Sequence, residues 1–379
     1  MKICFWASAS FEAPYSSYHL MRDLLRAFTD AGHEVWLVQP RCADGALPPA
    51  LLDIPGLHVC NVADKRVGKA NLAKRYAAQI RYFLRSARVV RQLRGIDAIF
   101  LQSNNAPFLP AHYAGRHGIP LIYNVQDIFP QNAAYSGTLR ETALSYRCFR
   151  ILQKYTFARC RKIVTISGDM RRTLIDAGAD PTRVTVIHNW ANAAPDAAAQ
   201  PRPHDGTCHV VYAGNIGRMQ NVELLLRAAK LLSDRSDICF DIYGDGPRRA
   251  QCMALAEGLA NVRFFDPLPP DEAYTLYRDA DINVVPLAKG IIRTALPSKT
   301  AACLRSGRRV IFCVDTDSAF AAAVKAQSDF QVVSPDSAED LAAAILQEKD
   351  NGDTTCAPLV SEFEKDRALQ AWCEILDEI

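Results

Sequence analysis

The chain has 379 residues, which is longer than one ordinary hydrophobic core requires, and this length predicts two domains. Hydrophobic residues make up 49% of the sequence and charged residues 22%, and these proportions exclude a disordered or fibrous chain. The formal net charge of +3 excludes a protein that binds nucleic acid through its bulk charge, so we expect no nucleic-acid partner.

The first half alternates strand-like and helix-like segments, a pattern typical of a parallel sheet with crossover helices. An amphipathic helix is predicted over residues 18–32, because apolar residues share one face and Gly32 can end it. The predicted strands of this half are residues 2–8, 33–40, 57–62, 97–103, 120–127, 162–167 and 184–190.

Residues 191–207, rich in Ala, Pro and Asp, have no periodicity and are interpreted as a linker. We therefore expect a first domain over residues 1–195 and a second over 208–360, both doubly wound α/β domains of Rossmann-like type. Because ligands of such sheets bind beyond the carboxyl ends of the strands, a cleft between the two domains is expected. The predicted strands of the second domain are residues 208–215, 238–247, 262–268, 281–287, 308–315 and 330–335.

Twelve cysteines are spread along the sequence without any CxxC pair. Several of them, such as Cys4, Cys239 and Cys313, lie inside apolar runs, where a thiol behaves as a small hydrophobic group. This usage is typical of a reducing compartment. The opening MKICFWASAS is strand-like, and no later stretch has the length needed to cross a bilayer, so we expect a cytoplasmic protein.

The loop AGNIGRMQN follows the first strand of the second domain and precedes a helix. Gly214 and Gly217 let the backbone approach a ligand, Arg218 adds a permanent positive charge, and Asn215 between the two glycines is a further candidate donor-binding residue. Helix amides and a guanidinium both favour oxyanions, so the loop is a candidate phosphate cradle. A tight turn with a surface arginine is the alternative interpretation.

Two further strand ends carry candidate donor-binding residues. The stretch YGDGP places Tyr243 and Gly244 at a strand end, although a simple turn would have the same sequence. In FFDPLPPDE, Pro267 stiffens the backbone beside Leu268, and main-chain groups here could read a nucleobase.

The stretch ALPSKTAACLRSGRRVIF predicts a short helix from Ser298 to Gly307, with Ser298 or Thr300 as its cap. A lysine at a helix entrance is disfavoured by the helix dipole, so Lys299 indicates an anionic ligand. Arg293 lies in the same loop, and together with Arg218 these cations could converge on one diphosphate.

Asp127 ends an apolar strand of the first domain and faces the expected cleft, although a helix cap or a turn would also account for it. The loop before His19 lacks the glycines of a dinucleotide fingerprint, so an NAD site is not expected. The acidic pairs at 279–281 and 315–317 have no neighbouring cluster of His or Glu, so no metal site and no cofactor are expected.

Residues 65–95 contain ten Lys or Arg and no acidic residue. Arg81, Arg85 and Arg88 fall on one helical face with aromatic residues between them. A solvated face is the usual interpretation of a charged helix, but such faces mix signs. We therefore expect this basic helix to bind an anionic membrane surface, with RNA binding as the weaker alternative.

The assembled loops resemble those of the family 4 glycosyltransferases of GT-B fold, in particular the bacterial branch that makes O-antigen, capsule or exopolysaccharide. The motifs that carry the resemblance are AGHEVWLV, YNVQDIFPQ, VTIS with VIHNW, YAGNIGRMQ, IYGDGP, DADINVVPL and LPSKTAACLRSGRRVI. The resemblance also implies that residues 361–379 form a helix that crosses back to the first domain.

The resemblance implies a retaining transfer of a sugar from a nucleotide donor without a metal. Arg218 and Lys299 would stabilise the departing diphosphate, and Asp127 would be a catalytic or sugar-binding residue. Many members of the family carry two glutamates eight residues apart, where this chain has Thr294 and Ala302. The usual lysine of the phosphate loop falls at Gln220.

The expected function is therefore a transferase at the inner face of the cytoplasmic membrane, with a UDP-sugar donor and a lipid-linked or saccharide acceptor. A nucleotide-sugar 2-epimerase of the same fold would need several acids and histidines around the sugar, and the stretch 295–312 supplies none. A non-catalytic scaffold is a third interpretation, but a complete set of cationic loops argues against it.

Overall fold

The computed structural model describes residues 1–11, 18–41, 51, 53–64, 72–191, 206–351 and 357–379. The chain divides into two compact units, Met1–His188 with Asp366–Ile379, and Asn189–Lys365. The first unit thus ends at His188 rather than at 195, and the chain rejoins it at Asp366 rather than at 361. Most of the expected linker lies outside the described residues. Each unit is described by itself.

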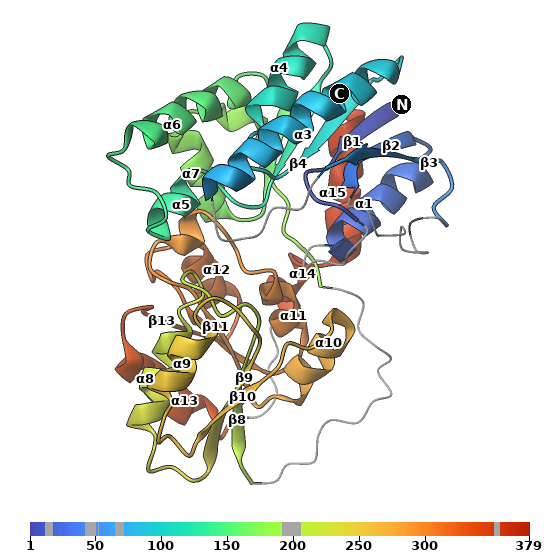
Figure 1. Cartoon of the computed structure of the whole chain (residues 1–379). Coiled ribbons are helices and arrows are strands. Elements are labelled where there is room, and N and C mark those ends of the chain that lie inside the picture. Colours follow the sequence, from blue (N-terminus) through green and yellow to red (C-terminus); the bar gives the residue numbers. More distant parts are fainter. Residues whose placement is uncertain (12–17, 42–50, 52, 65–71, 192–205, 352–356) are drawn as a thin grey trace. The chain divides into compact units, whose positions relative to one another are not determined.

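A seven-stranded parallel sheet forms the first unit, with the strand order β3-β2-β1-β4-β5-β6-β7 (Figure 1). Each strand that we predicted for this half is present, although the last is shorter than expected. The strands are β1 (Lys2–Trp6), β2 (Glu34–Arg41), β3 (Leu57–Ala63), β4 (Ala98–Gln102), β5 (Leu121–Val125), β6 (Lys162–Thr165) and β7 (Val184–Val186).

Helices cover both faces of this sheet, because neighbouring strand residues point to opposite sides. The helices are α1 (Tyr18–Asp30), α3 (Leu72–Gln92), α4 (Phe108–His117), α5 (Gln131–Tyr135), α6 (Leu144–Phe157), α7 (Gly168–Asp176) and α15 (Lys365–Asp377), with a 3-10 turn η1 (Pro181–Arg183).

Ring contacts show how the two faces are filled. Phe100 of β4 packs against Phe28 of α1 and Trp372 of α15, with ring centroids 5.7 and 5.3 Å apart. On the other face Trp6 of β1 meets Phe83 of α3 at 5.8 Å. Helix α15, at the end of the chain, therefore belongs to the core of the first unit.

A six-stranded parallel sheet forms the second unit, with the order β10-β9-β8-β11-β12-β13 (Figure 1). All six predicted strands are present. They are β8 (Cys208–Ala213), β9 (Ile238–Tyr243), β10 (Val262–Phe265), β11 (Ile282–Pro286), β12 (Arg309–Cys313) and β13 (Gln331–Val333). The helices are α8 (Val222–Leu231), α9 (Arg249–Leu255), α10 (Pro270–Asp279), α11 (Lys299–Arg305), α12 (Ala319–Gln327), α13 (Ala338–Glu348) and α14 (Ala357–Ser361), with a 3-10 turn η2 (Ile291–Arg293).

The strand order of the second unit reverses between β8 and β11. At such a switch point the two following loops leave in opposite directions and open a crevice at the carboxyl ends of the strands. The expectation of two doubly wound Rossmann-like domains is confirmed. None of the helices within the described residues combines enough length with enough apolar character to cross a bilayer.

Candidate functional site

The loops that follow β8 and β9 are joined through their backbones. The amide of Gly214 donates to the carbonyl of Tyr243 at 2.9 Å. A Cβ atom on Gly244 would lie 1.9 Å from the carbonyl oxygen of Gly214, and one on Gly246 would lie 2.4 Å from that of Ile216. Only glycine fits at these two positions, so the glycines of YGDGP shape the floor of the switch-point crevice.

The loop after β11 closes the other side of the crevice, since the amide of Ala288 donates to the carbonyl of Met219 at 2.9 Å. On the β10 side, the ring of Tyr243 stacks on Phe265 with centroids 4.4 Å apart. Pro267, which is exposed, and Leu268, which is half-buried, follow that stack. Nucleobase binding by this last loop stays a prediction.

Lys299 lies where the loops of β8 and β11 meet. Its Nζ is 3.5 Å from the centroid of the Tyr212 ring, and a Cβ on Gly214 would approach that nitrogen to 2.9 Å. The hydroxyl of Tyr212 donates to the carbonyl of Asn215 at 2.6 Å, which fixes the ring beneath the ammonium group. Sequence reasoning missed Tyr212, whose only signal is its position two residues before Gly214.

The Lys299 ammonium is buried and has no hydrogen-bond partner among the residues that the structure describes. The neighbouring Thr300 Oγ1 is also buried without a partner. Desolvation by burial lowers the pKa of Lys299 to about 7. The Tyr212 ring offsets part of this cost by a cation–π contact, but three N–H donors remain unused. Such a group is ready to receive an anion.

Two other predicted donor-binding cations lie in the loops around the crevice. Arg218 is exposed in the β8–α8 loop, four residues after Gly214. Arg293 is exposed in η2 and pairs with Asp317 at 2.9 Å, so an anionic ligand would have to compete with that carboxylate for the guanidinium group. Ser298 is exposed and makes no capping hydrogen bond, so its predicted role as a cap of α11 is wrong.

Residues that replace the family's usual polar contacts are engaged within the protein. The side chain of Gln220 accepts a hydrogen bond from Asn215 Nδ2 at 2.9 Å, beside Gly217, where a Cβ would crowd both side chains. Thr294 is fully buried, and its hydroxyl donates to the carbonyl of Ile291. Ala302 is half-buried within α11. Gln220 and Thr294 therefore support the loops from within.

The two acidic pairs have structural partners. Asp279 pairs with Arg278 at 3.0 Å, and Asp281 accepts from the amide of His209 at 2.7 Å. Asp315 is buried and accepts from the amide of Gly290 at 2.7 Å. The partner of Asp317 is Arg293, as described above. These carboxylates hold loops in place, which accounts for their presence beside turns.

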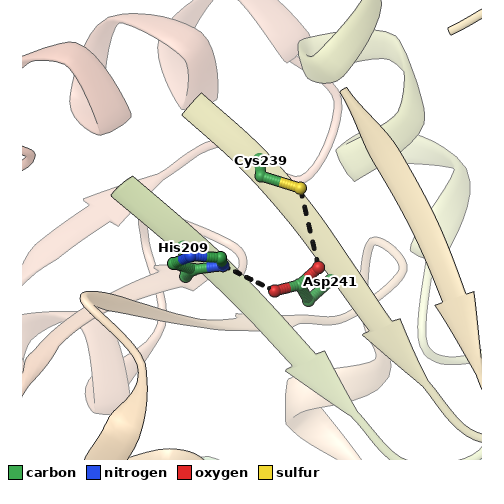
Figure 2. A group of neighbouring side chains, drawn as sticks. All are labelled: His209, Cys239 and Asp241. Atoms are coloured by element: carbon green, nitrogen blue, oxygen red, sulfur yellow. Dashed lines mark hydrogen bonds and ion pairs between the residues drawn. The ribbon is translucent and has the colours of Figure 1, made fainter. Parts of the chain in front are cut away.

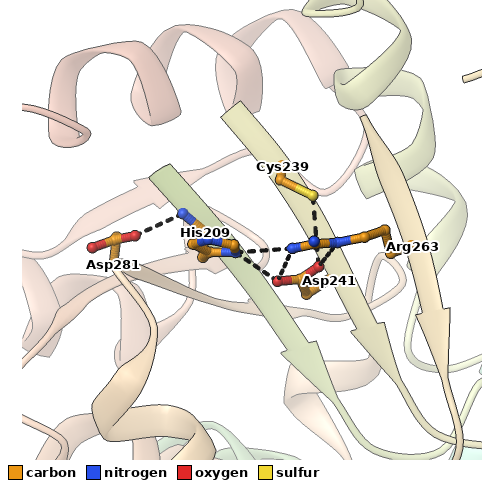
Figure 3. Close-up of polar contacts among 5 residues, drawn as sticks. All are labelled: His209, Cys239, Asp241, Arg263 and Asp281. Atoms are coloured by element: carbon orange, nitrogen blue, oxygen red, sulfur yellow. Dashed lines mark hydrogen bonds and ion pairs between the residues drawn. The ribbon is translucent and has the colours of Figure 1, made fainter. Parts of the chain in front are cut away.

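A cluster of His209, Cys239 and Asp241 has the ligand types and spacing of a metal site (Figure 2). Arg263 occupies it instead, donating to the two carboxylate oxygens of Asp241 at 2.7 and 3.0 Å (Figure 3). Nδ1 of His209 lies 2.8 Å from Asp241. The guanidinium takes the oxygens that a cation would need and adds a positive charge, so the residues do not fit a metal ion.

Asp127 lies directly beyond β5 in the first unit, and its amide donates to Ser103 Oγ at 3.4 Å. No described residue donates a hydrogen bond to its carboxylate. The residue is exposed, but its carboxyl lies beside the apolar side chains of a pocket, and the resulting desolvation raises the pKa of this carboxyl to about 6. A carboxylate with this pKa can accept a proton near neutral pH.

A pocket opens beside Asp127 within the first unit, and sequence reasoning missed its aromatic character. Tyr76, Phe129 and Phe149 form its core, with Tyr76 and Phe129 each 4.9 Å from Phe149 between ring centroids. The other lining residues are Asn105, Pro107, Phe108, Tyr123, Val125, Ile128, Leu152, Gln153, Phe157 and Leu174.

The predicted membrane-binding arginines lie on α3 and are all exposed. Arg81 approaches Asp64 at 3.9 Å, and Arg85 donates to the carbonyl of Ala63 at 3.3 Å. Arg88 lies one turn further along the same face. Asp64 therefore offsets part of the charge of Arg81, whereas the hydrogen bond of Arg85 to a neutral carbonyl leaves its charge unchanged.

Two family models match most of the chain. "Glycosyltransferase Family 4" matches residues 19–194, and "Glycosyl transferases group 1" matches residues 207–350. The Probable glycosyltransferase WbjE of Pseudomonas aeruginosa is 27% identical over 62% of each chain. The "Putative colanic acid biosynthesis glycosyl transferase WcaI" of Escherichia coli (strain K12) is 29% identical over 49% of this chain and 48% of its own. The chain thus aligns with less than two thirds of either relative.

Solved structures resemble the chain over its full length. Anabaena Alr3699/HepE in complex with UDP and glucose is 15% identical, with a TM-score of 0.71 and complete coverage of both chains. The lipopolysaccharide outer core galactosyltransferase WaaB, in its apo form, is 10% identical with a TM-score of 0.68 and the same coverage. At these identities the likeness shows the fold.

Proposed function

Because the chain belongs to the family 4 glycosyltransferases, we propose that it transfers a sugar from a nucleotide-sugar donor to a saccharide acceptor during cell-surface polysaccharide synthesis. The proposed donor is a UDP-sugar, and the proposed acceptor is a lipid-linked or free saccharide. Supporting observations are the switch-point crevice, the cationic loops around it and the names of the relatives, one of which refers to colanic acid biosynthesis.

The observation that carries the proposal is the buried ammonium of Lys299, which lacks a hydrogen-bond partner among the described residues. Burying a charge without a hydrogen-bonded counter-charge costs several kcal/mol, so such groups are uncommon unless a ligand completes them. The ammonium lies against Gly214, where a Cβ atom would approach it to 2.9 Å. A diphosphate at this point would supply the missing acceptors.

The same arrangement suggests how the leaving group is stabilised. Negative charge grows on the diphosphate as the bond to the sugar breaks, and Lys299 with Arg218 would bind that charge more tightly than they bind the donor. Arg293 would join them by exchanging Asp317 for a phosphate oxygen. We propose that these cations serve in place of a divalent metal and that the transfer retains the anomeric configuration.

Asp127 and its aromatic pocket are proposed as the acceptor side of the reaction. Aromatic rings stack on the apolar faces of sugar rings, and a carboxylate beside them can orient or deprotonate a hydroxyl group. We also propose that the basic helix contacts an anionic membrane. The described part of this helix is α3, and residues 65–71 lie outside the described residues.

Titration calorimetry with UDP, GDP and dTDP tests the donor site. Lys299→Met should weaken UDP binding by about 10- to 100-fold, because a charge-assisted hydrogen bond to phosphate is lost. Lys289→Met is the matched control, since Lys289 belongs to the same β11–α11 loop but is exposed and paired with Asp336 at 2.7 Å. That control should bind UDP within about twofold of the wild type.

Equal UDP affinity of Lys299→Met and the wild type would reject the proposed diphosphate position. Incubation with a panel of UDP-sugars, with and without a chelator, then tests the chemistry. A saccharide product with the donor's anomeric configuration, formed equally in both conditions, is the expected result. Conversion of the donor to its epimer without transfer would identify an epimerase, and binding without any turnover would identify a scaffold.

A further inference from the structure

Helix α6 of the first unit is apolar on its outer face. Leu144 and Ile151 are 75% and 67% exposed, and Cys148 between them is exposed as well. Their spacing of four and three residues places them in one stripe along the helix. The inner face of the same helix carries buried polar residues, Gln153 and Thr156. The same inner face also lines the aromatic pocket described above, so α6 is apolar on two faces, where an ordinary surface helix is apolar on one.

The inner polar residues have definite partners, which explains how α6 is held with its apolar stripe outward. Gln153 Nε2 donates to the carbonyl of Phe129 at 2.9 Å, and Gln153 Oε1 accepts from Arg150 at 2.6 Å. Thr156 Oγ1 donates to the carbonyl of Leu152 at 2.9 Å. Rotating the helix to bury Leu144 would break the hydrogen bond from Gln153 to the Phe129 carbonyl, whereas the other two hydrogen bonds lie within α6.

Positive charges flank the stripe. Arg147 and Lys154 are exposed on α6, and residues 142–168 contain six Lys or Arg and no acidic residue. The first unit as a whole has 26 Lys and Arg against 17 Asp and Glu, a charge of +9, whereas the second has 18 against 24, a charge of −6. The apolar stripe thus lies within the basic part of the chain.

We propose that the outer face of α6, formed by Leu144, Cys148 and Ile151 with Arg147 and Lys154, docks on a bilayer that contains anionic lipids. Leucine and isoleucine side chains would enter the interface between headgroups and acyl chains, while the cations bind lipid phosphates. This proposal refines the membrane contact named above, because it places the apolar anchor on α6 and leaves α3 a purely electrostatic role.

Charge complementarity favours a bilayer over a second copy of the chain. In a two-fold symmetric contact the same surface meets itself, so the positive charges of Arg147 and Lys154 from both copies would gather in one interface and repel one another. An anionic bilayer instead offers apolar chains for the stripe and phosphates for its flanks. One face of the helix would then make both the apolar and the charged contacts that a stable membrane anchor needs.

Vesicle co-sedimentation of the full chain tests the proposal without depending on the transferase reaction. The wild type should bind vesicles that contain about one third anionic lipid, and binding should fall as salt rises. The double variant Leu144→Gln with Ile151→Gln should lose about tenfold or more in the partition coefficient, because two buried side chains are replaced. Glutamine keeps helix propensity, so the fold is expected to persist.

The matched control is Leu231→Gln with Leu255→Gln, which changes two leucines of the acidic second unit that are 54% and 53% exposed. Its partition coefficient should stay within about twofold of the wild type. Equal loss in both double variants, or no loss in the α6 variant, would overturn the proposal. So would a dimer in sedimentation velocity that the α6 substitutions dissociate, because the stripe would then be an interface between copies.

UDP binding by the α6 variant distinguishes this proposal from the proposed function. The variant should bind UDP as the wild type does, since α6 belongs to the first unit and the diphosphate residues to the second. Loss of vesicle binding with intact UDP binding supports the α6 surface, whatever the outcome of the transferase assays.

Discussion

Lys299 differs from Arg293, the other predicted cation of its loop, because no described residue pairs with its charge. Arg293 has Asp317, and Lys289 of the same loop has Asp336, but the Lys299 ammonium has no hydrogen-bond partner among the described residues and lies over the ring of Tyr212. The sequence predicts an anion at this lysine because a helix entrance disfavours a cation. It could not predict the burial, because Tyr212 and Gly214 lie some 85 residues earlier and reach Lys299 only through the folded sheet.

The unmatched charge of Lys299 should appear in the stability of the free protein. Its pKa is lowered from the unfolded value of 10.5 to about 7, so between these values the unfolded state binds more protons. The penalty is therefore complete below pH 7 and disappears as pH rises towards 10.5. Lys299→Met should consequently raise the free energy of unfolding at pH 6.5, and the gain should shrink at pH 9.5.

Urea unfolding at the two pH values measures this difference, with Lys289→Met as the control. Lys289→Met should show no such pH-dependent gain, because Lys289 is exposed and its pKa is raised by the neighbouring carboxylate of Asp336. A loss of stability in Lys299→Met at pH 6.5 would mean that the ammonium has a structural partner and is not held for a ligand.

The sequence patterns predicted the strands and helices, but they did not predict which loops contact one another through their backbones. Apolar runs predicted all of the strands, because parallel strands covered on both faces are apolar throughout. The glycines of YGDGP predicted a turn, but not that this turn packs on the backbone of Gly214. Similarly, His209, Asp241 and Arg263 come from three neighbouring strands, so the contacts of His209 and Arg263 with the buried Asp241 could not be predicted from any single segment.

Substitution of Gly244 tests whether the joined loops form the floor of the donor site. Gly244→Ala should lower the free energy of unfolding by about 2 kcal/mol or more, because the new Cβ would overlap the carbonyl oxygen of Gly214. It should also weaken UDP binding, since Gly214 would move. Gly258→Ala, also at positive φ but with open space around it, should cost only about 1 kcal/mol and leave UDP binding unchanged.

Thermal or urea unfolding with parallel UDP titration separates the two variants. Similar destabilisation of both would show that Gly244 is required for its backbone conformation alone. Unaltered UDP affinity in a destabilised Gly244→Ala variant would remove the β9 loop from the donor site.

The two units of the chain have net charges of opposite sign, +9 and −6, which the overall net charge of +3 does not reveal. The sequence did reveal the basic stretch 65–95, but it directed attention to α3, where Arg81 and Arg85 turn out to have partners at β3. The exposed stripe of α6 could not be predicted, because Leu144 and Ile151 have the apolar character of core residues. Their exposure depends on the orientation of the helix, which the hydrogen bond of Gln153 to Phe129 helps to fix. Solvent exposure is decided by tertiary packing, which periodicity does not report.

The buried ammonium and its proposed diphosphate can be tested together by measuring proton uptake when UDP-glucose binds, since the diphosphate of this donor does not titrate near neutral pH. Calorimetry at pH 8.0 in buffers of different ionisation enthalpy gives the number of protons taken up. We predict uptake of nearly one proton by the wild type, because the neutral Lys299 must regain its charge, and none by Lys299→Met. Binding of UDP-glucose by Lys299→Met with the same proton uptake and the same affinity as the wild type would contradict the assignment of Lys299 as the diphosphate ligand.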